Sequence, residues 1–136
     1  MIPAVLFAAW AWLKPYSWNS DPAARCKVVE TLVTRDGNYY WVNIHLNVSE
    51  GSRHDLRQLV RLVPESAPGL PPADTTFAGP QPENPREIWF KFWLARTEIA
   101  RPLRLQLNQG QLVIKTSDRL PDLADRQSIN FTSDRW

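Results

Sequence analysis

Two segments of this chain alternate apolar with polar or aromatic residues at a period of two, and this pattern constrains the fold more than any other feature. In residues 39–48 the apolar positions are Tyr40, Val42, Ile44, Leu46 and Val48. In residues 87–94 they are Ile88, Phe90, Phe92 and Leu94. A period of two predicts strands whose two faces meet different environments, whereas a helix would scatter the same residues around its circumference.

Weaker patterns predict further strands around these two. Residues 25–34 form another strand if a β-bulge near Glu30 reconciles its uneven alternation, and Asp36-Gly37 supplies the hairpin turn that follows. Residues 103–107 and 112–116 flank Asn108-Gln-Gly-Gln, which predicts a second hairpin. Shorter candidates are strands at residues 60–63, 75–77 and 129–131, and a helical turn at residues 98–100.

These elements predict an all-β fold of one domain. The chain has 136 residues and twelve prolines, seven of them in residues 64–85, and no strand–helix–strand pattern occurs. Short strands joined by hairpins indicate an antiparallel sandwich or barrel, and a domain of about 100 residues favours the β-sandwich. We expect it over residues 25–136, after a linker at residues 19–24 and an apolar segment at residues 1–18.

The layout resembles that of immunoglobulin-like domains in small bacterial exported or membrane-anchored proteins of unknown function. The resemblance is carried by the strand at residues 40–46, the strand at residues 88–92 and the Leu-Arg-Leu-Gln-Leu hairpin strand at residues 103–107. It covers roughly residues 25–117 and rests on pattern alone. It implies a β-sandwich outside the cytoplasm and brings no catalytic residues with it.

The N-terminal segment is apolar and ends in residues that favour a membrane–water interface. Its apolar and amphipathic side chains are Ile2, Val5, Leu6, Phe7, Trp10, Trp12, Leu13, Tyr16 and Trp18. Trp, Tyr and Lys settle at headgroup level, so we expect a short, helical membrane anchor. Residues 2–13 would span roughly 18 Å as a helix, against about 30 Å of hydrocarbon.

Three interpretations of that short segment stay open. The sequence can be the remainder of a longer apolar segment, the segment can lie shallow in the bilayer or beside partner helices, or it can pack on the domain. We expect an anchor that places the domain on the periplasmic side of the membrane. The lack of a basic region before the apolar run disfavours a cleaved signal peptide.

The outward positions of the two strongest strands carry the candidate binding residues. Trp89, Lys91 and Trp93 alternate with the apolar residues of their strand, and Trp41 does so on the other strand. Tryptophan is enriched at protein contacts and also stacks on sugar rings. A third interpretation is that another part of the chain covers these side chains.

Other function classes find little support in the sequence. The net charge of +2 comes from interspersed signs, so we expect no nucleic-acid partner. One cysteine, Cys26, permits no internal disulfide, and two histidines lack a zinc-type spacing, so we expect no metal or other cofactor. Ser49, Ser52, His54 and Asp55 are close in sequence but lack a nucleophile elbow, so we expect no enzymatic activity.

These observations predict a membrane-tethered accessory or interaction module, which can be a small subunit of a larger membrane protein complex. Trp41, Trp89, Lys91 and Trp93 would contact a membrane protein partner. The alternative is a carbohydrate-binding module that uses the same tryptophans.

Overall fold

The computed structural model describes residues 21–136, and its regular structure is almost entirely antiparallel β-strand. The all-β prediction is therefore confirmed. In chain order the elements are the 3-10 turn η2 (Pro22–Ala24), β1 (Cys26–Asp36), β2 (Tyr39–Val48), β3 (Arg61–Pro64), β4 (Asp74–Ala78), β5 (Glu87–Ala95), the helical turn α2 (Arg96–Ile99), β6 (Leu103–Leu107), β7 (Gly110–Lys115) and β8 (Ser128–Phe131).

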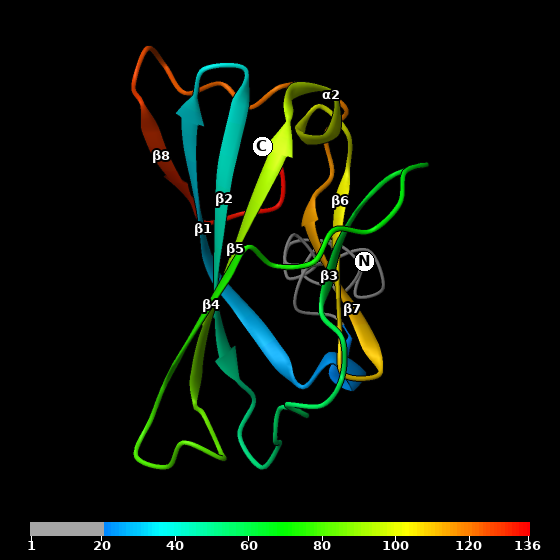
Figure 1. The fold of residues 1–136 in the computed structure, drawn as a ribbon, viewed down its shortest axis with the longest axis vertical. Coiled ribbons are helices and arrows are strands. Elements are labelled where there is room, and N and C mark those ends of the chain that lie inside the picture. The colour runs from blue at the N-terminus through cyan, green and yellow to red at the C-terminus, as the bar shows by residue number, and fades with distance from the viewer. Residues whose placement is uncertain (1–20) are drawn as a thin grey trace, which may run out of the picture.

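The strands form two sheets (Figure 1). The larger has five strands in the order β4-β5-β2-β1-β8, and the smaller has three in the order β3-β6-β7. The predicted strands at residues 75–77 and 129–131 become β4 and β8, the two edges of the larger sheet. The proline-rich segment and the C-terminal segment therefore extend this sheet sideways.

Both sheets contribute to a single core. In β2 and β5 each even-numbered residue is buried, as the period of two predicts, and the three-stranded sheet adds Leu62, Leu105, Leu112 and Ile114. Full burial of one such side chain stabilises the fold by about 1.5–3 kcal/mol. The odd-numbered residues of β2 and β5 consequently lie on the opposite side of the sheet, called here the outer face.

A β-bulge in β1 decides which side chains reach the outer face. The register against β2 shifts between Val28 and Glu30, as predicted, so Val28 and Thr31 are both buried although they are three positions apart. Glu30 then lies opposite His45 on the outer face. Without the extra residue, strict alternation from Val28 would turn Glu30 toward the core.

Both predicted hairpins are confirmed. Gly37 joins β1 to β2 with φ of +61°, a conformation that glycine adopts without strain. Asn108 starts the turn between β6 and β7, and its side-chain Nδ2 donates to the carbonyl oxygen of Ala24 at 2.6 Å. At Gly110 a Cβ atom would collide with the backbone of Ala24, so glycine allows η2 to approach β7 closely.

Residues 21–24 differ from the expected linker. Ala24 is fully buried in the core, and Asp21 accepts hydrogen bonds from the backbone N–H groups of Ala23 and Gln111. These residues therefore belong to the packed domain. The expected anchor residues, Ile2 to Trp18, lie outside the described part of the chain.

The C-terminal residues pack over a buried lysine. Lys115 has no exposed surface, and its Nζ donates to the carbonyl oxygen of Ser117 at 2.6 Å. Burial lowers the pKa of the Lys115 ammonium from 10.5 to about 8. The ring of Trp136 lies 5.9 Å from Nζ and stacks on Phe131 at 4.9 Å between ring centroids.

Candidate functional site

The register of β2 against β5 brings the predicted contact residues together on the outer face. Trp41 lies directly opposite Trp93, and Lys91 and Trp89 follow at successive outward positions of β5. Trp93 keeps 37% of its surface exposed. The structure thus places Trp41, Trp89, Lys91 and Trp93 on one face, and their role as binding residues stays a prediction.

Three aromatic rings and one ammonium group form a cluster on this face, near the first residues of β2. Its members, called here the aromatic cluster, are Tyr39, Trp41, Lys91 and Trp93. Tyr39 stacks on Trp93 with ring centroids 5.0 Å apart and planes 14° from parallel. Trp93 in turn meets Trp41 at 4.4 Å, with the planes tilted by 56°. The Nζ of Lys91 lies 4.6 Å from the centroid of the Trp41 ring, which is cation–π geometry.

Trp89 belongs to a separate arrangement toward the other end of the strands. The His45 ring stacks on Trp89 at 4.4 Å with planes only 8° apart. His45 Nε2 lies 3.1 Å from Glu87 Oε1, and its Nδ1 lies 3.7 Å from Glu30 Oε1. Glu30 also accepts a hydrogen bond from Asn130 Nδ2 at 2.6 Å. We call Asn130, Glu30, His45 and Glu87 the polar row; it crosses β8, β1, β2 and β5.

The ring geometry determines how this face can be contacted. Neighbouring strands lie about 4.8 Å apart, close to the 4.4 Å separation of the His45 and Trp89 rings. The two ring planes therefore stand upright on the sheet, and one face of each ring is covered by the other ring. In the aromatic cluster, Tyr39 likewise occupies a face of Trp93 and Lys91 occupies a face of Trp41. At least one face of each of these rings is therefore already occupied by a neighbour on the sheet.

Sequence reasoning found part of this site. It gave His45 no binding role and it missed Tyr39, although the same alternation puts both residues on the outer face. Glu30 and Glu87 were also missed. Asn130 reaches Glu30 from a strand 100 residues further along the chain, and no local pattern could have indicated that contact.

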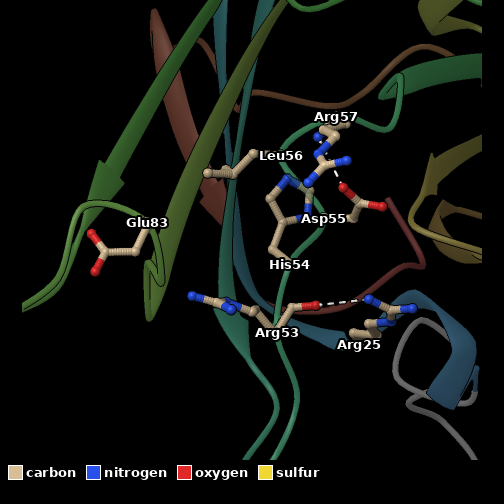
Figure 2. Close-up of a pocket in the computed structure, with 7 residues that line it drawn as sticks. All are labelled: Arg25, Arg53, His54, Asp55, Leu56, Arg57 and Glu83. Atoms are coloured by element: carbon tan, nitrogen blue, oxygen red, sulfur yellow. Dashed lines mark hydrogen bonds between the residues drawn. The ribbon is translucent and has the colours of Figure 1, made fainter.

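A hollow of about 510 Å³ lies beside the loop between β2 and β3, lined by residues outside the aromatic cluster and the polar row (Figure 2). Arg25, Arg53, His54, Asp55 and Arg57 are among the residues that line it. Figure 2 shows the side chains of Arg53 and Arg25 extending to opposite sides of His54. These cations therefore do not converge on one point.

Contacts around His54 tie the loop to the domain. The His54 ring is 4% exposed and packs near Phe77 and Phe90, with 6.1 Å between ring centroids in each case. Burial lowers the pKa of His54, although the side chain of Asn108 opposes the shift. The backbone N–H of Asp55 donates to Asn108 Oδ1 at 2.7 Å. These contacts brace the loop against the rest of the domain.

The cysteine and the acidic side chains do not assemble a further site in residues 21–136. Within this range no three His, Cys, Asp or Glu side chains gather in a way that could hold a metal ion. Cys26 is buried, and burial raises the pKa of its thiol to about 12. At neutral pH this thiol is a weak nucleophile and a poor metal ligand.

Comparison of the chain with protein-family models, with curated proteins and with solved structures found no match. In the part of the chain that the structure describes, none of the helices is both long and apolar enough to cross a membrane. The functional argument therefore rests on the geometry of the outer face.

Proposed function

We propose that this chain is a non-enzymatic, membrane-tethered interaction module whose outer face contacts a protein partner. Its fold would be an immunoglobulin-like β-sandwich, a proposal supported by the single core that the two sheets share. Residues 2–18 would tether it on the periplasmic side of the membrane, as an accessory domain or a small subunit of a membrane protein complex.

The observation that carries this proposal is the aromatic cluster. Four large side chains are held against one another by stacking and cation–π contacts, yet Tyr39 and Trp93 keep 45% and 37% of their surface exposed. Rigid, half-exposed aromatic side chains lose little conformational entropy when a partner covers them. Such side chains often dominate the binding energy of protein interfaces.

The orientation of the rings favours a protein over a sugar. A sugar stacks by laying its C–H groups on an open aromatic face, but here several ring faces are already occupied by neighbours on the sheet. A protein surface can instead pack against upright rings and bond to the polar groups between them.

The proposal can be tested by recovering the full-length chain from its native membranes in mild detergent, followed by mass spectrometry. We expect defined membrane proteins to be recovered in constant ratio with the parent chain. The double variant Trp89→Ala/Trp93→Ala should lose them while its circular dichroism spectrum stays that of a folded β-protein.

The matched control is Leu59→Ala, which removes a side chain that is 74% exposed and lies outside the strands of the outer face. It should leave recovery unchanged. Equal recovery with the double variant would contradict the proposal. A change in tryptophan fluorescence on adding polysaccharide fragments, without any protein partner, would favour the carbohydrate-binding alternative.

A further inference from the structure

Charge is unevenly distributed between the outer face and the rest of the chain. Residues directly opposite one another in antiparallel strands share a face, so the registers assign every charged side chain of the five strands to one side. The charged residues of the outer face are Lys27, Glu30, Asp36, Asp74, Glu87 and Lys91. Four acids and two bases give this face −2, whereas the whole chain carries +2.

We propose that the outer face binds a protein segment that presents a basic side chain, an arginine or a lysine, to the carboxylates of Glu30 and Glu87. This inference rests on the proposed function, because it specifies the chemistry of the partner at the same face. The aromatic cluster would pack against apolar atoms of that segment, and the polar row would pair with its positive charge.

The two carboxylates are held in place before any partner arrives. Asn130 Nδ2 donates to Glu30 Oε2 at 2.6 Å, and His45 Nε2 lies 3.1 Å from Glu87 Oε1. Even so, the Glu30 and Glu87 side chains keep 40% and 47% of their surface exposed. An exposed carboxylate with a fixed position binds a cation at a lower entropic cost than a freely rotating one.

The neighbourhood of these carboxylates suits a basic side chain in particular. The indole of Trp89 lies on the strand position between Glu87 and Lys91 and stacks against His45, so an aromatic surface stands beside the two acids. A guanidinium group can pair with a carboxylate and also contact an aromatic ring. A negatively charged surface would be repelled by the net charge of this face.

The test uses two synthetic ten-residue probes, one of alternating Thr and Arg and one of alternating Thr and Glu. Each is titrated into the full-length, 15N-labelled chain in non-ionic detergent at low salt, where charge effects are least screened. We expect the Thr–Arg probe to shift the indole resonance of Trp89 and the side-chain resonances of Asn130. The Thr–Glu probe should leave both unchanged.

The double variant Glu30→Gln/Glu87→Gln should weaken Thr–Arg binding about tenfold, which is the loss of about 1.4 kcal/mol. The control double variant Glu83→Gln/Asp125→Asn removes the same charge from exposed loops and should change the affinity less than twofold. Equal weakening by both variants, binding of the Thr–Glu probe at the same residues, or no shift at Trp89 would overturn the inference.

The two proposals fail in different ways. In one case the Trp89→Ala/Trp93→Ala variant loses its membrane partner, while Glu30→Gln/Glu87→Gln keeps that partner and binds the Thr–Arg probe as tightly as the parent. The outer face is then the contact surface, and only the inference that the partner presents a basic side chain fails. If the tryptophan variant keeps its partner, the outer face is not the contact surface and the proposed function fails.

Discussion

The inner and outer faces of β2 and β5 come from the same two strands but are held together differently. The inner face is a fully buried apolar layer that both sheets share. The outer face is partly exposed, and its side chains are fixed by ring stacking, by one cation–π contact and by the polar row. Burial therefore stabilises one face, while contacts between neighbouring strands organise the other, which is the face that we propose contacts a partner.

The largest expected effect comes from breaking the inner face. Phe92→Ala removes a fully buried ring and leaves a cavity, so we expect it to lower the free energy of unfolding by about 3–5 kcal/mol. Urea denaturation of the parent and the variant measures this. A decrease in the free energy of unfolding of less than about 1 kcal/mol would contradict the buried position of Phe92 in the core.

Lys115 sharpens the comparison because it places a charge in a fully buried position. The pKa is about 8 in the fold and 10.5 ordinarily, so between these pH values the unfolded chain binds more protons. Stability should therefore rise by about 3 kcal/mol from pH 8 to 10.5. Below pH 8 this contribution is absent.

The variant Lys115→Met cannot titrate and isolates that contribution. Urea denaturation across the same pH range should show that the rise is missing from the variant, and that the variant unfolds less readily than the parent at pH 7. Parallel pH profiles for the two chains would show that Lys115 does not titrate as a buried group.

A smaller effect is expected on the outer face at the position next to Phe92. Trp93→Ala removes the ring contacts with Tyr39 and Trp41 but opens no buried cavity, so it should cost about 1 kcal/mol in urea denaturation. Trp93→Ala should therefore destabilise the fold much less than Phe92→Ala, although the two residues are neighbours in β5. Equal losses for the two variants would remove the distinction between the faces.

The smallest effect is expected in the polar row. Asn130→Ala removes the hydrogen bond to Glu30, which is exposed to solvent, so stability should fall by about 0.5 kcal/mol. Amide hydrogen exchange along β8 should nevertheless accelerate, because this bond ties the edge strand to β1. Unchanged exchange in β8 would show that the row contributes nothing to the order of the sheet.

Much of the fold could be predicted because it is encoded locally. The period of two fixed which side of β2 and β5 is buried, Gly37 marked a tight turn, and the uneven spacing of residues 25–34 indicated the bulge at Glu30. Each of these signals lies within about ten residues of the feature that it predicts.

The candidate site was only half predictable, because its contacts depend on register and on distant segments. Alternation puts Trp41 and Trp93 on the same side, but only the pairing of β2 with β5 shows that they touch. The link from Asn130 to Glu30 requires β8 to pair with β1. The burial of the His54 ring depends on Phe77 in β4 and Phe90 in β5, two neighbouring strands at one edge of the five-stranded sheet.

The most direct test of the central claim is site-specific photocrosslinking in native membranes. Leu32 lies on the outer face opposite Asn43 and is 39% exposed, whereas Leu59 is more exposed and lies outside that sheet. With p-benzoylphenylalanine at position 32, we expect a crosslink to one membrane protein, and at position 59 none. A crosslink from position 59 alone would contradict the claim that the outer face is the contact surface.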